Sequence, residues 1–139
     1  MNKSKPRLKT PDEVDAVLYE AFKCCDPDVI AGLWAEEGVV CVHPGAGAIV
    51  DYDAIIRSWA VIFSNSRGTE IRHTVIKRVV SNELAVYVMA EEMLSSGTVT
   101  AVVLATNVYR QFDTGWLMIE QHASLVQSRN KGQTLQRCY

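Results

Sequence analysis

The segment from Thr98 to Leu125 constrains the fold more than any other part of the sequence, because it predicts two long adjacent β-strands. Thr98 to Phe112 is rich in Val, Thr and Tyr, and Trp116 to Leu125 follows after the three-residue turn Asp113-Thr114-Gly115. The glycine of such a turn can take a positive φ, so the two strands are expected to form a β-hairpin. Strands of this length need other elements to cover them.

Pairing Phe112 with Trp116 across the turn decides which side chains share a face, since neighbouring residues of a strand point to opposite sides. One face then carries Ala105, Asn107, Tyr109, Ile119, Gln121 and Ala123, and the other carries Thr106, Val108, Arg110, Met118, Glu120 and His122. Both faces mix apolar and polar residues. This mixture favours helices packed on one side and a polar surface or a partner on the other.

Three helix starts are recognisable before the long strands. Thr10 has the N-cap residue type, and Glu13 three positions later predicts a capping box. Asp26 caps a second predicted helix, Asp28 to Ala35, and Asp51 opens a third. Each of these segments repeats apolar residues at helical spacing, so each helix is expected to bury one face.

The remaining segments predict strands. Val39 to His43 is a short strand followed by a turn at Pro44 to Gly47, while Glu70 to Val80 and Glu83 to Leu94 precede the hairpin. The order is therefore helix, helix, strand, helix and four antiparallel strands. We expect an α+β fold, a barrel-like arrangement in which a strongly curved antiparallel sheet closes over three N-terminal helices.

The composition is that of one globular domain. The chain has 139 residues, of which 48% are hydrophobic and 22% charged, which predicts a single domain over residues 10–127 with flexible tails at 1–9 and 128–139. A net charge of −2 argues against a general nucleic-acid or anionic-membrane binder. No apolar run approaches the roughly 20 residues that span a bilayer, so no membrane-spanning segment is expected.

The spacing of the cysteines and histidines does not indicate a metal site or redox chemistry. The four cysteines, Cys24, Cys25, Cys41 and Cys138, lack CxxC spacing, and the three histidines lack HxH or HExxH spacing. We expect a cytoplasmic protein with reduced cysteines and no bound metal. Cys24 and Cys25 are interpreted as packing residues at a helix end.

Two segments carry a resemblance to a known family. VVCVHPGAGAIVDYDAII (39–56) has a strand and turn that lead into a helix, and TNVYRQFDTGWLMIEQHAS (106–124) has a closing hairpin with a terminal His-x-Ser. Together with the order of elements, they resemble the nuclear transport factor 2-like superfamily with its SnoaL-like cone fold. Within it, the segment from Pro11 to Ser124 is most similar to the association domain of calcium/calmodulin-dependent protein kinase II.

The resemblance implies a cone with an internal cavity and a homodimer formed through the sheet. It also identifies departures from the association domain. His43 stands where that domain has a glutamate, Asn107 stands where it has an arginine in its hairpin, and Glu91 aligns with an arginine of its preceding strand. The arginine-lined anion pocket of that domain is therefore not expected here.

Glu91 and His43 are the candidate catalytic residues. Glu91 continues the strand face of Ala85, Tyr87 and Met89, where an apolar residue is expected, and a carboxylate in an apolar cavity has a raised pKa suited to general acid or base catalysis. The pattern also fits a solvated Glu91 at a fraying strand end. His43 ends a strand before a Pro-Gly turn and can shuttle protons, or it can serve only to stabilise the turn.

Five further residues are candidate ligand contacts. Two are amides that can meet a ligand or satisfy each other, and three are aromatic residues that can form a pocket wall or belong to the core: Asn107, Gln121, Tyr109, Trp34 and Trp59. His122 and Ser124 lack a Gly-x-Ser-x-Gly elbow, so they are interpreted as structural or interface residues. His73 is predicted to be a solvated edge-strand residue.

Two functions remain open at this point. The first is a SnoaL-like small-molecule pocket protein, with a small polar or hydrophobic ligand and cofactor-free proton-transfer catalysis of isomerase, dehydratase or cyclase type. The second is a non-catalytic association or ligand-sensing module. A buried carboxylate in the cavity favours the first, and an exposed apolar sheet face favours the second.

Overall fold

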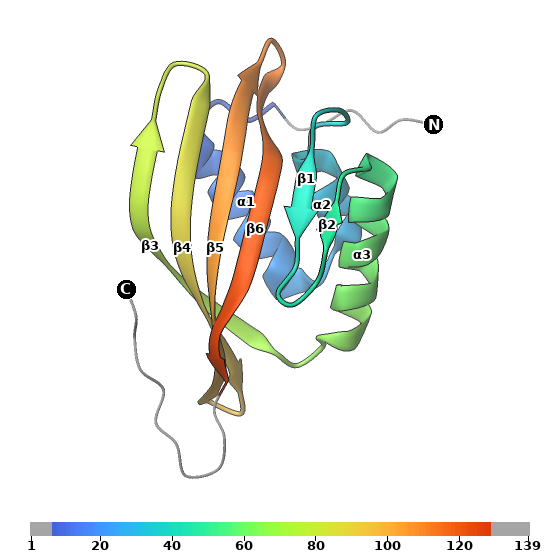
Figure 1. The fold of residues 1–139 in the computed structure, drawn as a ribbon, viewed down its shortest axis with the longest axis vertical. Helices are drawn as coiled ribbons and strands as arrows, with labels where there is room; N and C mark the ends of the chain where they lie inside the picture. Colours follow the sequence, from blue (N-terminus) through green and yellow to red (C-terminus); the bar gives the residue numbers. More distant parts are fainter. Residues whose placement is uncertain (1–6, 129–139) are drawn as a thin grey trace.

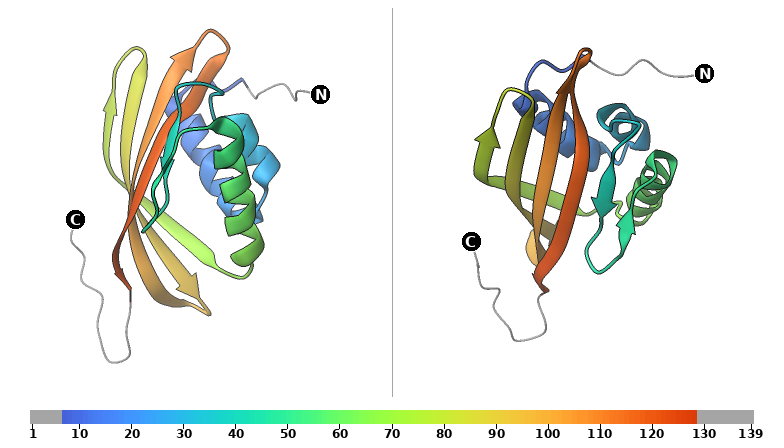
Figure 2. Two further views of the ribbon diagram at one scale, coloured as in Figure 1. Left: turned by 45° about the vertical axis from the view of Figure 1, so that its right-hand side comes forward. Right: turned by 45° about the horizontal axis from the view of Figure 1, so that its top comes forward.

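A computed structural model describes residues 7–128 as three helices packed against one face of a curved sheet (Figure 1; Figure 2, left). The elements, in chain order, are α1 (Pro11–Cys24), α2 (Pro27–Leu33), β1 (Val40–Val42), β2 (Ala48–Ile49), α3 (Tyr52–Asn65), β3 (Glu70–Val80), β4 (Leu84–Ser95), β5 (Thr98–Phe112) and β6 (Gly115–Ser128). The predicted α+β cone is confirmed. Most of the two predicted tails lies outside the described residues, and so does Cys138.

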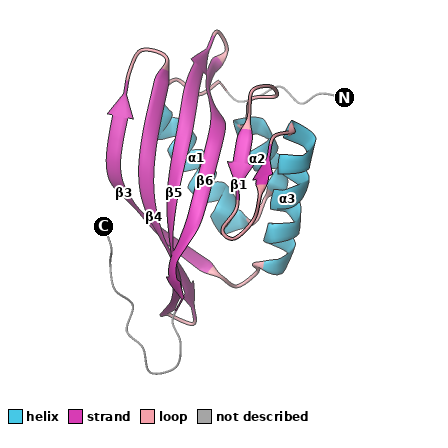
Figure 3. Ribbon diagram, in the orientation of Figure 1, coloured by secondary structure: helices cyan, strands magenta, loops and turns pink. Residues whose placement is uncertain are grey.

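The sheet differs from the prediction in three respects. Its strand order is β2-β1-β6-β5-β4-β3, and it is open rather than closed into a barrel (Figure 3). It is also mixed, because β1 runs parallel to β6, with Val40 opposite Glu120 and Val42 opposite His122. The two-residue strand β2, which pairs with β1, was not predicted. Two residues are too few to show a period-2 pattern.

Helix capping follows the sequence closely. Oγ1 of Thr10 accepts a hydrogen bond from the backbone N–H of Glu13 at 3.1 Å, so the predicted N-cap is confirmed. The second half of the capping box is different, since the Glu13 carboxylate accepts from the N–H of Lys9 rather than from that of Thr10. The side chains of Asp26 and Asp51 cap α2 and α3 as predicted.

Helix α2 ends earlier than the sequence predicts. Trp34 is already extended and forms a parallel bridge with Met118 of β6, and the N–H of Ala35 donates to the Met118 carbonyl at 2.9 Å. Pairing with β6 therefore replaces the last predicted helical turn. This pairing fixes the position of α2 and of the following β1 strand relative to the sheet.

The predicted register of the hairpin is wrong next to the turn and correct further along the strands. Next to the turn, Phe112 pairs with Gly115 instead of Trp116, and Tyr109 pairs with Met118. Ile119 is then an extra residue in β6, a β-bulge, after which Val108 pairs with Glu120. The predicted register holds from that point to the middle of the hairpin.

Because of the bulge, the predicted face of Met118 is wrong. The predicted register placed this side chain on the face opposite to that of Tyr109, but it is fully buried on the inner face beside Tyr109. After the bulge, Asn107 lies opposite Gln121, and both point inward as predicted. One extra residue therefore lets β6 bury apolar side chains near the turn and direct an amide into the middle of the fold.

Candidate functional site

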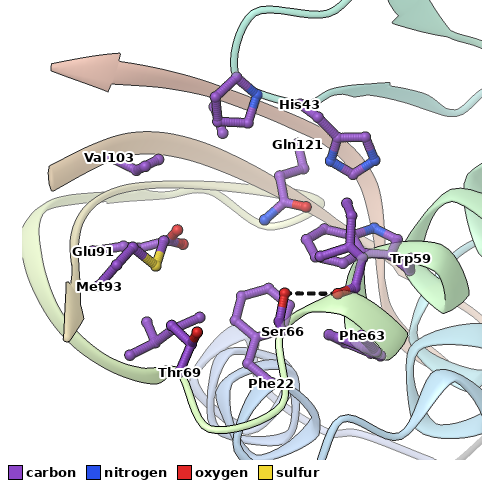
Figure 4. Close-up of a pocket in the computed structure, with 14 residues that line it drawn as sticks. Phe22, His43, Trp59, Phe63, Ser66, Thr69, Glu91, Met93, Val103 and Gln121 are labelled. Carbon is purple, nitrogen blue, oxygen red and sulfur yellow. Dashed lines mark hydrogen bonds between the residues drawn. The ribbon is translucent and has the colours of Figure 1, made fainter. Parts of the chain in front are cut away.

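A cavity of about 150 Å³ lies between the helices and the inner face of the sheet (Figure 4). Helices α1 and α3, the residues after β1, the loop that leads to β3, and strands β3 to β6 all contribute to it. Most of its wall is apolar or aromatic. The lining residues are Phe22, His43, Pro44, Trp59, Ile62, Phe63, Ser66, Thr69, Ile71, Glu91, Met93, Val103, Gln121 and Ala123.

Glu91 lines this cavity from the middle of β4. Its side chain is 4% exposed, so the alternative of a solvated carboxylate at a fraying strand end is wrong. The Tyr19 hydroxyl of α1 donates a hydrogen bond to Oε2 of Glu91 at 2.6 Å. Burial raises the pKa of Glu91 from 4.5 to about 7; the Tyr19 hydrogen bond opposes the rise and the Asp15 charge adds to it.

A buried polar network stands behind Glu91. Nδ2 of Asn107 donates to the Tyr19 hydroxyl oxygen at 3.3 Å, and the Tyr109 hydroxyl donates to Oδ1 of Asp15 at 3.0 Å. Burial raises the pKa of Asp15, and the Tyr109 hydrogen bond opposes that rise. Two carboxyl groups with raised pKa values therefore share one interior, each held by a tyrosine.

Sequence reasoning did not identify Asp15 of α1 as part of this network. Asp15 is only 7% exposed, and it lies on the same stripe of the helix as Tyr19 and Phe22, at positions i, i+4 and i+7. An acid and a phenol on the stripe that also carries a cavity-lining phenylalanine were the available signal. The signal is weak, because Asp15 follows the fully buried Val14 in an otherwise ordinary amphipathic helix.

His43 follows β1 at the side of the cavity opposite Glu91, with Gln121 between them (Figure 4). Its Nε2 lies 2.8 Å from Oγ of Ser58, whose hydroxyl donates to the carbonyl of Ile55 at 2.6 Å. Because the only hydroxyl proton of Ser58 is used in that bond, we assign the proton to Nε2 of His43, which donates to Oγ. Burial lowers the pKa of His43, so the ring is neutral at neutral pH with Nδ1 as acceptor.

Gln121 projects from β6 into the cavity (Figure 4). It is 3% exposed, and its Oε1 has no hydrogen-bond partner among residues 7–128. Oδ1 of the cross-strand neighbour Asn107 also lacks a partner within the same range. A hydrogen bond between two amides needs one of these oxygens as acceptor, so the two amides do not satisfy each other.

The candidate residues thus fall into three places. His43, Trp59, Glu91 and Gln121 meet at the cavity. Asn107 and Tyr109 are fully buried behind it, in the polar network, and Trp34 is buried beside β6, away from the cavity lining. The aromatic wall is completed by Phe22 and Phe63, whose rings pack on Trp59 at centroid distances of 5.0 and 5.6 Å.

The other histidines lie outside the cavity lining. His122 is exposed on the outer face of β6, with Thr106 as its partner, so it does not act with a cavity residue. His73 is exposed on β3, yet its ring stacks on Tyr19 with a centroid distance of 3.9 Å and an angle of 8°. The prediction of a merely solvated His73 missed this contact.

The described part of the chain contains neither a cluster of metal-binding side chains nor a helix that could span a membrane. No group of three or more His, Cys, Asp or Glu side chains within residues 7–128 is arranged to hold a metal ion. None of the helices in this range is long and apolar enough to cross a membrane.

The comparisons with known proteins point to one family. A sequence profile of the SnoaL-like domain matches residues 13–128. A comparison with curated proteins gives no match.

Several solved structures are similar along most of the chain. A candidate calcium/calmodulin-dependent protein kinase type II association domain from Thiobacillus denitrificans ATCC 25259 is 26% identical, with a TM-score of 0.83, covering 88% of this chain and 100% of that one. A candidate dehydratase of the nuclear transport factor 2-like family from Streptomyces avermitilis is 29% identical, with a TM-score of 0.73 and coverage of 83% and 93%. A candidate ketosteroid isomerase from Parabacteroides distasonis ATCC 8503, 19% identical with a TM-score of 0.67 and coverage of 87% and 96%, shares the fold.

Proposed function

Because this chain belongs to the SnoaL-like domain family, of the nuclear transport factor 2-like fold, we propose that it binds a small molecule in its cavity and catalyses proton transfer with Glu91 as acid and base. The observation that carries the proposal is the burial of Glu91 in the cavity wall, with one carboxylate oxygen held by Tyr19 and a pKa raised to about 7. General acid and base catalysis is most efficient when the pKa of the group lies near the working pH.

The reaction consists of two proton movements. The Glu91 carboxylate removes a proton from a carbon next to a carbonyl group. The electron pair of that C–H bond forms a C=C bond to the carbonyl carbon, and the π pair of the C=O bond moves to the oxygen. The protonated Glu91 then returns the proton, either to another carbon, which is an isomerisation, or to a leaving hydroxyl group that departs as water, which is a dehydration. Both outcomes balance without an added oxidant or reductant.

The other polar groups assist in defined ways. Tyr19 fixes Oε2 of Glu91, so Oε1 is the oxygen available for proton transfer. Neutral His43 offers Nδ1 as an acceptor on the far side of Gln121, which suits it to hold a donor group of the ligand or to accept a proton. The aromatic wall of Phe22, Trp59 and Phe63 excludes water from the reacting carbon.

The proposal is tested with cyclohex-3-enone, a single-ring ketone that becomes conjugated when one proton moves. We expect the wild-type protein to accelerate formation of cyclohex-2-enone, measured by its ultraviolet absorbance, and Glu91→Gln to abolish the acceleration while keeping the circular dichroism spectrum. A parallel carboxyl-carbon NMR titration should place the pKa of Glu91 near 7. An ordinary pKa near 4.5, or equal rates for both proteins, rejects the catalytic role.

A second proposal is association into a homodimer through the outer face of the sheet. That face carries a half-buried apolar band, Val86, Val88, Leu104 and Val108, and Val86 pairs directly with Val108. Met118 does not contribute to this face, because it is buried inside. The 26% identity to a candidate association domain, over its full length, also favours association.

Sedimentation velocity tests the second proposal. At tens of micromolar we expect a dimer, and we expect Val88→Lys to shift it to a monomer because a charge is placed in the middle of the band. Val61→Lys is the matched control, since Val61 is 59% exposed on α3, away from the sheet face. A wild-type monomer under these conditions rejects the dimer.

A further inference from the structure

The amide of Gln121 is an acceptor without a donor. Its side chain is nine-tenths buried or more, it projects into the cavity between Glu91 and His43, and its Oε1 meets no hydrogen-bond donor within residues 7–128. A buried carbonyl oxygen that lacks a donor is unfavourable, and native structures pair the great majority of such groups. A ligand that brings one hydroxyl or N–H group supplies the missing donor.

The size of the cavity limits the rest of the ligand. Its volume is about 150 Å³, and an engineered protein cavity of this volume binds benzene. The rings of Phe22, Trp59 and Phe63 and the side chains of Ile71, Met93 and Val103 form its apolar wall. A single ring therefore fills the space beside these residues, and a second fused ring would extend beyond it.

The residues that line the cavity also limit the charge of the ligand. Neither lysine nor arginine is among the lining residues, and the one ionisable acid of the lining, Glu91, is 4% exposed. An anionic ligand would enter an apolar space beside a carboxyl group with no cation to compensate it, which is strongly unfavourable. The lining therefore disfavours an anion, and an uncharged ligand is the one that needs no compensating charge in this apolar space.

We propose that the cavity binds an uncharged single-ring molecule whose hydroxyl or N–H group donates a hydrogen bond to Oε1 of Gln121. This inference rests on the proposed function only in taking the cavity as the ligand site. It identifies Gln121 as the residue that selects among ligands, a task distinct from the acid and base chemistry of Glu91. The donor group holds the ring in one orientation, with the reacting carbon toward Glu91.

Four probes of related shape test each part of the proposal with the full-length protein. Phenol carries the donor, anisole offers only an acceptor, benzoate is charged, and 2-naphthol has a donor on two fused rings. Dissociation constants are measured by NMR chemical-shift titration at pH 7. We expect phenol to bind about tenfold or more tightly than anisole, since only phenol pairs Oε1, and we expect benzoate and 2-naphthol to bind more weakly than phenol.

Two variants connect the preference to Gln121. Gln121→Leu should make phenol and anisole bind equally, because the acceptor is gone while the wall stays apolar. Ser124→Ala, an exposed position on the same strand, should keep the wild-type preference. If Gln121→Leu does not fold, Gln121→Met replaces it, and the comparison of probes in the wild-type protein stands without either variant.

The outcomes separate this inference from the proposed function. Equal binding of phenol and anisole by the wild-type protein, tight binding of benzoate or 2-naphthol, or no binding of phenol overturns the inference. The carboxyl titration of Glu91 and the enone assay are independent of these probes. A Glu91 pKa near 7 with no phenol preference would leave the catalytic proposal standing, and an ordinary pKa with a clear phenol preference would leave only the binding inference.

Discussion

The hydroxyl of Tyr19 lies 2.6 Å from Oε2 of Glu91, and this hydrogen bond joins α1 to β4 across the buried end of the cavity. The phenol acts as a donor to the carboxylate, so it favours the charged form of Glu91. The stacked ring of His73 and the amide of Asn107 hold the phenol in place from two other strands. Tyr19 is therefore a positioning residue for the proposed acid and base.

Replacing Tyr19 by Phe should raise the pKa of Glu91 above about 7, because burial remains and the stabilising donor is lost. The measurement is a carboxyl-carbon NMR titration of the labelled variant beside the wild type. Tyr52→Phe is the control, since its hydroxyl donates to the Ala31 carbonyl and does not contact Glu91. An unchanged or lower pKa of Glu91 in Tyr19→Phe would contradict the assigned direction of the hydrogen bond.

Replacing Trp59 by Ala should lower the free energy of unfolding by about 3 kcal/mol, at the lower end of the range for a large buried aromatic residue. Trp59 is 8% exposed and packs on Phe22 and Phe63, but one side of its ring already borders the cavity. Urea unfolding measures the change. Val61→Ala, at an exposed position on the same helix, should change it by less than about 0.5 kcal/mol. A loss below about 1 kcal/mol for Trp59→Ala would refute its packing role.

Local sequence signals predicted most of the fold. Strands β3 and β5 have the predicted ends, and Thr10, Asp26 and Asp51 are all N-caps. These features depend on a few neighbouring residues, such as a capping side chain, a turn glycine or alternating β-branched residues. Their physical causes are therefore present in the sequence itself.

The errors arose where contacts between distant segments decide the structure. The bulge at Ile119 shifts the face of every residue on the turn side of it, and a period-2 pattern counted from the turn cannot detect one extra residue. Helix α2 ends where Trp34 pairs with Met118, a contact between residues far apart in the chain. Propensity at residues 34 and 35 alone gave no sign of that pairing.

In the candidate site, too, the features set by neighbouring residues were predicted and those set by contacts between distant segments were not. Strand parity directed Glu91, Asn107 and Gln121 inward, and all three are buried. Parity does not give depth, so it could not separate Gln121, which reaches the cavity, from Asn107, which hydrogen-bonds Tyr19 behind it. The contribution of α1 depends on how the helix packs across the sheet, and no local pattern specifies that.

Gly115 should tolerate substitution poorly. Its φ is +123°, a conformation that other residues rarely adopt, and an added Cβ would lie 2.6 Å from the backbone oxygen of Leu8. That oxygen accepts a hydrogen bond from the N–H of Trp116 at 2.8 Å, so it cannot move away freely. Gly115→Ala should lower the free energy of unfolding by about 1 to 3 kcal/mol.

Gly47→Ala is the matched control for Gly115→Ala. An added Cβ at Gly47 meets no atom within 4 Å. Urea unfolding of the two variants should therefore show a clear loss of stability only for Gly115→Ala. Equal unfolding midpoints for both variants would show that Leu8 can move away from the hairpin turn without a loss of stability.

The stability of the protein should depend on pH through the titration of Glu91. The pKa of Glu91 is about 7 in the folded protein and 4.5 without burial, so the folded state binds the proton more tightly than the unfolded state does. The contribution of this proton to the free energy of unfolding is full below pH 4.5, falls as the pH rises toward 7, and is absent above about 7. The difference between the two pKa values corresponds to about 3 kcal/mol.

Glu91→Gln removes this proton equilibrium while keeping an acceptor for the Tyr19 hydroxyl. Urea unfolding of both proteins at several pH values between 4 and 8.5 should show the wild type losing about 3 kcal/mol relative to the variant as the pH rises from 4.5 to about 7. The raised pKa of Asp15 gives a slope of the same sign, but it is present in both proteins and largely cancels in the difference. A difference that stays constant with pH, or one that grows in favour of the wild type, would show that Glu91 is ionised in the folded protein as readily as in water, and it could not then serve as an acid near neutral pH.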